Sequence, residues 1–147
     1  MESIYNNDNI IKALLFRKES SNFLDKTIYS NLDRTSLLYN QIYPWMMVPQ
    51  VESEPNAFVT SRFVYKPHDH KFMISNFYLY SIVYRTWMST DYGLLTDFLA
   101  DEIRKNIHNS HLLGIGKVGF AGMTEGSFDK DGNWLYNCIE FQTYDFH

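Results

Sequence analysis

Hydrophobic residues recur at helical spacing in three parts of the chain. Residues 8–18 carry an apolar stripe behind the capping residues Asn7 and Asp8, with Arg17 and Lys18 at the other end, and predict a short helix. Between Glu19 and Asn40 the pattern weakens, although Asn31 or Asp33 would cap a second short helix. From about Asp91 helical spacing returns. It predicts a third helix, with an apolar stripe of Leu94, Leu95, Phe98, Leu99, Ile103 and Ile107 opposite Asp97, Asp101, Arg104 and Lys105.

Aromatic and β-branched runs predict four strands. Phe58–Tyr65 and Phe77–Trp87 are separated by the polar segment Lys66–Lys71 and predict an antiparallel pair. Both faces of the second run are apolar, so that strand is expected at the centre of a sheet or covered on both sides. Leu112–Met123 and Trp134–Phe146 predict two further strands. The polar turn between them contains an Asp-Gly pair.

This order of elements predicts an α+β fold: a mixed or antiparallel sheet of about four strands, with helices packed on one face. No break in composition divides the chain, so residues 1–147 are expected to form a single domain. Residues 41–56 carry Pro44, Pro49 and Pro55 around a strongly apolar stretch, and are expected to be an extended connection without regular structure. Such a segment either packs on its own domain or docks on a neighbour.

Composition favours protein–protein contact. Hydrophobic residues make up 45% and aromatic residues 17% of the chain. Because Tyr and Trp combine an apolar body with a polar tip, this excess suits interfaces and favours an oligomer. A net charge of −4 argues against sequence-specific nucleic-acid binding. No secretion leader or apolar run of about 18 residues is visible, so no membrane association is expected.

Each motif that suggests chemistry lacks the context that the chemistry needs. Gly114–Gly119 spells GxGxxG but lies in a predicted strand with no helix after it, so no nucleotide is expected. The His68-Asp69-His70 segment and the pair His108 and His111 lack a third metal ligand. The segment 129–133 resembles a calcium loop but has its glycine too early, and Cys138 is expected to be a packed thiol. We therefore predict no cofactor, no metal, no catalytic residue and no enzyme activity. A small ligand-binding or hydrolytic enzyme that uses Tyr and His side chains stays as the alternative, and a pocket with convergent polar groups would favour it.

Three stretches resemble the tail-terminator and tail-completion proteins of the head-to-tail junction in long-tailed bacteriophages. They are the proline-bracketed segment 42–49, the strand-to-helix passage 84–93 that leads to Asp97, and Gly114-Ile115-Gly116 followed by the closing strand Tyr136–Phe146. Where that family often places an arginine before the helix aspartate, this chain has Leu94 and Leu95.

The resemblance implies a virion subunit, made in the cytoplasm of the host bacterium, that assembles as a hexameric ring. It would cap the tail tube and contact the tail tube protein and the head-completion or adaptor proteins, with DNA only as passing cargo. A head-completion adaptor or stopper of the same neck is the close alternative, and a binding module of a bacterial secretion or tail-like device is another. Candidate lumen-facing residues are Glu140 and Gln142. Candidate subunit or partner contacts are Tyr43, Pro44, Trp45, Met46, Met47, Asp129, Lys130 and Asp131.

Overall fold

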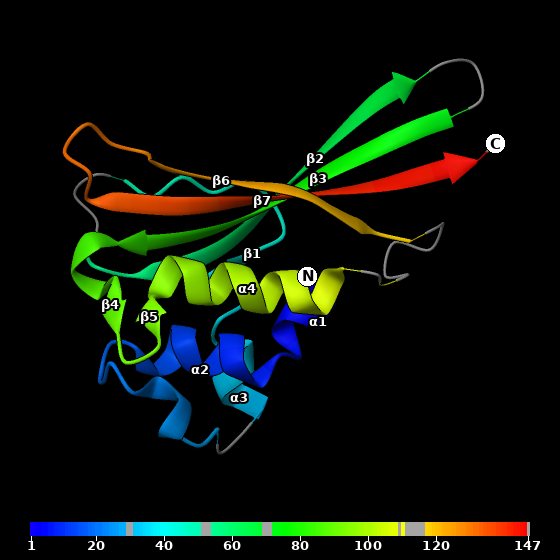
Figure 1. Ribbon diagram of the computed structural model, residues 1–147. Coiled ribbons are helices and arrows are strands. Elements are labelled where there is room, and N and C mark those ends of the chain that lie inside the picture. Colours follow the sequence, from blue (N-terminus) through cyan, green and yellow to red (C-terminus); the bar gives the residue numbers. More distant parts are fainter. Residues whose placement is uncertain (29–30, 51–53, 69–71, 109, 111–116, 147) are drawn as a thin grey trace.

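A computed structural model describes residues 1–28, 31–50, 54–68, 72–108, 110 and 117–146. A five-stranded sheet in the order β1-β2-β3-β7-β6 forms one layer (Figure 1). Its strands are β1 (Ile42–Tyr43), β2 (Ala57–His68), β3 (Phe72–Tyr84), β6 (Gly119–Ser127) and β7 (Trp134–Phe146). β1 pairs with β2 in parallel, and every other neighbouring pair is antiparallel.

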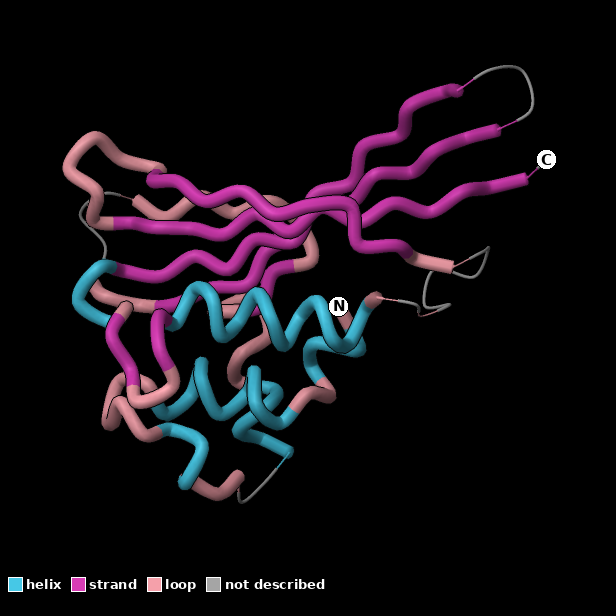
Figure 2. Tube along the Cα trace, viewed as in Figure 1, coloured by secondary structure: helices cyan, strands magenta, loops and turns pink. Residues whose placement is uncertain are grey.

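The helices gather on one face of this sheet (Figures 1 and 2). They are α1 (Glu2–Tyr5), α2 (Asp8–Phe16), α3 (Asn31–Thr35) and α4 (Leu95–Ile107), with the short 3-10 helices η1 (Phe23–Asp25) and η2 (Arg85–Trp87). A two-stranded hairpin, β4 (Ser89–Thr90) and β5 (Gly93–Leu94), leads into α4. α4 lies against the sheet and α2 packs on α4, so the helical layer is two helices deep.

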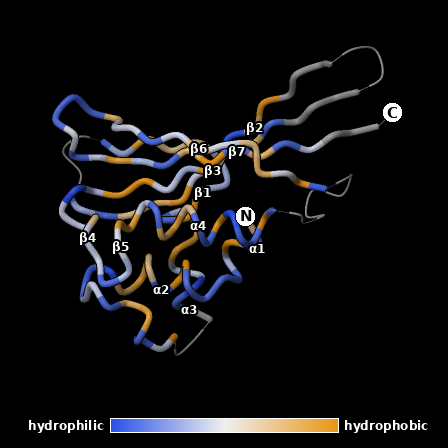
Figure 3. Tube along the Cα trace, in the orientation of Figure 1, coloured by the Kyte–Doolittle hydropathy of each residue, from blue (hydrophilic) through white to orange (hydrophobic). Residues whose placement is uncertain are grey.

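Local chemistry explains where the main helices form. Asn7 caps α2, because its side-chain oxygen accepts a hydrogen bond of 2.9 Å from the Ile10 amide. α4 buries Leu99 and Ile103 fully in the core, while its outer face carries an Asp101–Lys105 ion pair of 2.6 Å. The resulting core joins both layers, and Figure 3 shows hydrophobic segments in the helices and in the sheet above them.

The far ends of β2, β3 and β7 extend past the helical layer (Figure 1). The β2–β3 ladder runs without a shift from Ala57 opposite Val83 to His68 opposite Phe72, and Phe72 in turn lies opposite Phe146. We call this projecting part of the sheet the overhang.

The α+β class, the helices on one face and the central position of the strand β3 are confirmed. The bounds of β7 are those predicted, and the short helix predicted at 8–18 is α2. The predicted second helix is present as α3, but it ends at Thr35, so the expectation that it carries Leu37, Leu38 and Tyr39 is wrong.

Several predicted boundaries are wrong. The proline-rich segment does contain regular structure, because Ile42 and Tyr43 pair with β2 before Pro44 ends the strand. Lys66–His68 continue β2 instead of forming a connection, and residues 69–71 lie outside the described residues. The strand predicted at 77–87 is β3, which covers residues 72–84, and residues 85–87 form the short helix η2. The third helix starts at Leu95 because Gly93 and Leu94 belong to β5. The strand predicted at 112–123 is β6, which spans Gly119–Ser127, with 112–116 outside the described residues.

Candidate interaction surface

Two of the predicted contact residues, Tyr43 and Met47, pack on the face of the sheet opposite the helices. We call it the open face. Because side chains alternate along a strand, it carries the neighbours of the core residues Val59, Leu79 and Ile139. Its main residues are Phe58, Thr60, Arg62, Asn76, Tyr78, Tyr80, Ile82, Tyr84, Trp134, Tyr136, Cys138, Glu140 and Gln142.

An aromatic cluster occupies one end of the open face. Its buried centre is formed by Phe58, Ile82 and Trp134. The Trp134 ring lies 5.5 Å from Phe58 and 5.0 Å from Tyr84, measured between centroids. Residues packed around this centre are Tyr43, Met47, Tyr80, Tyr84, Phe128 and Tyr136. This end of the sheet therefore has a second, small core, and no residue of the described helices packs against it.

The proline-bracketed segment divides between its own domain and solvent. Tyr43 and Met47 pack on the aromatic cluster, and the Met46 sulfur accepts a hydrogen bond of 3.7 Å from the Thr60 hydroxyl. Pro44 and Trp45 point outward, with Trp45 53% exposed. Part of the segment therefore packs on its own domain, and docking of the exposed part on a neighbour stays a prediction.

Tyr39 joins the exposed residues although the sequence did not single it out. It is 60% exposed and stacks on Trp45 at 5.4 Å between centroids, and Tyr43 meets the Trp45 ring edge-on at 5.9 Å. We call Tyr39, Tyr43 and Trp45 the aromatic ridge. Tyr39 has a φ of +61°, a left-handed backbone that residues other than glycine seldom adopt, so no pattern in the sequence would place its ring here.

A polar strip lies farther along the open face, around Glu140. The Glu140 carboxylate accepts hydrogen bonds from the Asn76 amide at 3.1 Å and the Tyr78 hydroxyl at 3.4 Å. On the neighbouring strand Glu140 pairs with Gly122, where an added Cβ would meet nothing within 4 Å. Gln142 lies two residues farther along β7, on the same face. Glu140 and Gln142 thus face away from the core, and their position in a lumen stays a prediction.

Cys138 lies between Tyr80 and Thr124 on the open face and is half-buried. Burial raises the pKa of the Cys138 thiol, and burial together with the Cys138 side chain raises the pKa of Tyr80 to about 12. Both groups therefore stay protonated near neutral pH, as expected of packed side chains.

Asp129 is engaged within the β6–β7 turn. Its carboxylate accepts hydrogen bonds from the backbone amides of Trp134 at 2.9 Å and Asn133 at 3.1 Å, and these bonds lower its pKa. Gly132 has a φ of +67°, which the turn requires. The predicted hairpin turn is confirmed. Lys130 and Asp131 lie exposed beside it, and their predicted role as contacts stays a prediction.

The described residues contain no group of three or more His, Cys, Asp and Glu side chains that could hold a metal ion. The His108 Nδ1 atom instead accepts a hydrogen bond of 3.1 Å from the Phe120 amide. Asp69, His70, His111 and Gly114–Gly116 lie outside the described residues, and Gly119 opens a strand, not a helix. Among the described helices, none is long and apolar enough to cross a membrane.

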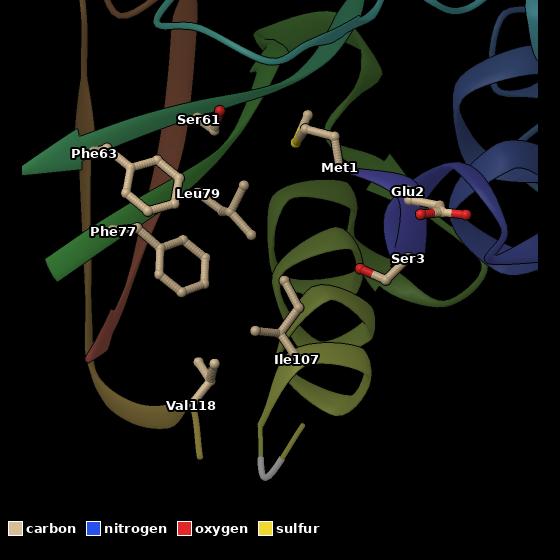
Figure 4. Close-up of a pocket in the computed structure, with 9 residues that line it drawn as sticks. All are labelled: Met1, Glu2, Ser3, Ser61, Phe63, Phe77, Leu79, Ile107 and Val118. Atoms are coloured by element: carbon tan, nitrogen blue, oxygen red, sulfur yellow. The ribbon is translucent and has the colours of Figure 1, made fainter. Parts of the chain in front are cut away.

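A cavity of about 130 Å³ lies on the helical side, where the overhang leaves the helices (Figure 4). Phe63, Phe77, Leu79, Ile107 and Val118 make up most of its wall. Met1 also borders it, and burial lowers the pKa of the N-terminal amine. A wall of this kind suits an apolar group better than an acid–base pair.

These features define an α+β protein that presents an aromatic ridge and a polar strip on a sheet face that none of the described helices covers. The chain belongs to the YomW family, whose model matches residues 7–139. YomW is a family associated with bacteriophages of the Bacillus SPbeta type. No curated protein matches the chain.

Proposed function

We propose that the protein is a ring-forming tail terminator, a structural subunit of the phage virion that caps the tail tube and joins it to the head. The aromatic ridge carries this proposal. A tryptophan side chain offers about 150–250 Å² of surface, so an exposed fraction of 53% at Trp45 leaves roughly 100 Å² for a partner. Half-exposed Tyr and Trp beside a packed cluster are typical of the centres of protein interfaces.

Family membership and charge support the same proposal. A phage-associated family makes a virion or phage-assembly role the natural setting for such a surface. Six subunits of −4 would carry −24 around a ring, and this charge would oppose adhesion of DNA that passes through. We assign the polar strip around Glu140 to that passage, and the aromatic ridge to the tail tube protein or to the head-completion proteins. In this role the protein is not an enzyme.

Deletion of the gene from the phage tests the function. A terminator stops growth of the tail tube, so the deletion should yield overlong tails that are not joined to DNA-filled heads, as seen by electron microscopy. Tails of normal length with heads that lose DNA would identify a head-completion stopper or adaptor instead. Infectious particles of normal appearance would refute both roles.

Substitution of the aromatic ridge tests its part in that function. Tyr39→Ser with Trp45→Ser should reproduce the deletion phenotype, because both side chains are mostly exposed and contribute more to a partner than to the fold. Leu94→Ser is the matched control, since Leu94 is 49% exposed but lies in β5, within the helical layer. A control variant as defective as the ridge variant would contradict the assignment.

A further inference from the structure

Four phenylalanines, one from each long strand, cross the sheet on its helical side. Phe63, Phe77 and Phe141 stack with successive centroid distances of 5.4 and 5.1 Å, and Phe120 meets Phe141 edge-on at 6.2 Å. The two inner rings are buried, whereas the outer rings, Phe63 and Phe120, are 48% and 39% exposed. We call this row the phenylalanine ladder, and its exposed ends lie on opposite edges of the sheet.

One end lies on β2. Among the described residues β1 pairs only with Val59 and Thr60, so β2 forms the edge of the sheet from Ser61 onward. The cavity of about 130 Å³ lies beside this edge, and Ser61 and Phe63 contribute to its wall. Figure 4 shows the Phe63 and Phe77 rings, Leu79 and Ile107 around the same space. This edge therefore presents an exposed ring next to an apolar hollow.

The other end lies on β6, the strand at the opposite edge. Its nine residues include no Lys, Arg or Pro, the residues that commonly protect an edge strand from pairing with another chain. Phe120 and Met123 project to the helical side, and Met123 is 52% exposed. This edge therefore presents two apolar side chains that could fill a hollow.

We propose that copies of the chain join edge to edge, with residues 119–123 of β6 in one copy added to the edge that β2 forms from Ser61 onward in the next copy. β2 and β6 run in opposite directions within the sheet, so a neighbour in the same orientation pairs antiparallel. If Phe120 opposes Phe63 of the next copy, the bulge between Phe120 and Gly122 places Met123 opposite Ser61, at the cavity. The phenylalanine ladder then continues from one copy to the next.

A second copy of the chain is the partner that both edges indicate, because the projecting Phe120 and Met123 side chains of one edge can pack against Phe63 and the cavity at the other edge. Pairing of β6 with β6 would join two sets of projecting side chains and leave the cavity and Phe63 exposed. Joining unlike edges is a heterologous contact, which closes into a ring when the rotation between copies allows it. Only this closure into a tail-capping ring rests on the proposed function; the pairing of the edges does not.

Paired cysteines test the register while the phenylalanine ladder stays intact. The proposed pairing sets Arg62 opposite Gly122 on the open face. Arg62 is exposed, and a side chain at Gly122 would meet nothing within 4 Å. Directly opposed residues bring their Cβ atoms to about 4.5–5.5 Å, which a short bis-maleimide spans. In a Cys138→Ser background, Arg62→Cys with Gly122→Cys should give a series of covalent multiples of 17.4 kDa on a denaturing gel.

Each single-cysteine variant should remain monomeric on the same gel. Cross-linking of Gly122→Cys with itself would show β6–β6 pairing and overturn the proposal. A folded double variant that stays monomeric at micromolar concentration would also overturn it. Met123→Asp should abolish the series, whereas Thr124→Asp, on the other face of β6, should preserve it. A positive series together with normal tails after gene deletion would retain the edge pairing and refute the tail-terminator role.

Discussion

Two glycines of β6 that share the open face predict opposite effects of the same substitution. At Gly126 an added Cβ would lie 2.6 Å from the Tyr136 hydroxyl oxygen and 2.8 Å from its Cζ atom. The Tyr136 ring cannot move away freely, because it packs against Phe128 at 4.5 Å and Tyr80 at 5.9 Å between centroids. At Gly122 the Cβ meets nothing within 4 Å.

The magnitudes follow from these contacts. Replacement of a strand glycine by alanine stabilises by about 0.5–1 kcal/mol where the new side chain fits, as it does at Gly122. At Gly126, overpacking against the aromatic cluster costs about 1–3 kcal/mol and outweighs that gain. Gly126→Ala should therefore be less stable than Gly122→Ala by about 2 kcal/mol, which is about 1 M in the urea midpoint.

Urea unfolding followed by tryptophan fluorescence measures the difference. In a Tyr136→Val background the penalty at Gly126 should disappear, so a double-mutant cycle should return a coupling energy of about 2 kcal/mol. Equal midpoints for Gly122→Ala and Gly126→Ala, or a coupling energy near zero, would refute the packing of Tyr136 over β6.

Three further outcomes follow from individual side chains. Glu140→Lys leaves the buried Asn76 amide without its acceptor and should cost about 1–3 kcal/mol of unfolding free energy, whereas Glu140→Gln keeps an acceptor and removes only the charge. DNA ejection should therefore be compared between Glu140→Gln and the native phage, and an unchanged rate would contradict a lumenal Glu140. The pKa of Tyr80 is about 12 in the folded protein, whereas tyrosine in an unfolded chain has a pKa of about 10. The protonated Tyr80 hydroxyl therefore contributes its full stabilisation below pH ~10, and this contribution is lost as the pH rises toward the folded pKa. Tyr80→Phe should reduce that alkaline loss in urea midpoints, and an unchanged slope would contradict the assignment. Asn7→Ala should cost about 1 kcal/mol through the lost cap of α2 and Asn7→Asp much less, and equal thermal midpoints would count against the cap.

Where burial dictates residue type, the fold could be predicted from the sequence. The run that begins at Phe77 is apolar on both faces because β3 is the middle strand, with a core on the helical side and the aromatic cluster on the other. The first and last residues of β7 could be predicted because an Asp-Gly turn precedes a run of alternating apolar and polar residues. The turn itself could be predicted because it needs an acceptor for backbone amides and a residue with a positive φ, which Asp129 and Gly132 provide.

The predicted ends of strands and helices were wrong where the polarity of the residues does not change at the end of the element. β2 continues through Lys66–His68 into the overhang, although the polar sequence there predicted a connection. The short hairpin that holds Gly93 and Leu94 has too few residues to show an alternating pattern. The sequence therefore did not reveal it, and α4 starts later than the predicted helix.

The candidate surfaces were only partly visible in the sequence for a related reason. Trp45 and Tyr43 could be chosen because an apolar segment between prolines is unusual, but Tyr39 depends on a left-handed backbone that no pattern reports. The phenylalanine ladder depends on register across four strands, including the bulge next to Phe120. Register is a property of pairing between distant segments, and composition does not report it.

Electron cryomicroscopy of the intact phage particle tests the central claim most directly. We predict density for this chain as a closed ring between the end of the tail tube and the head, with the aromatic ridge in contact with a neighbouring protein and neighbouring copies joined from β6 to β2. A neck in which every ring is accounted for by other proteins, with this chain absent from the particle, would contradict the account.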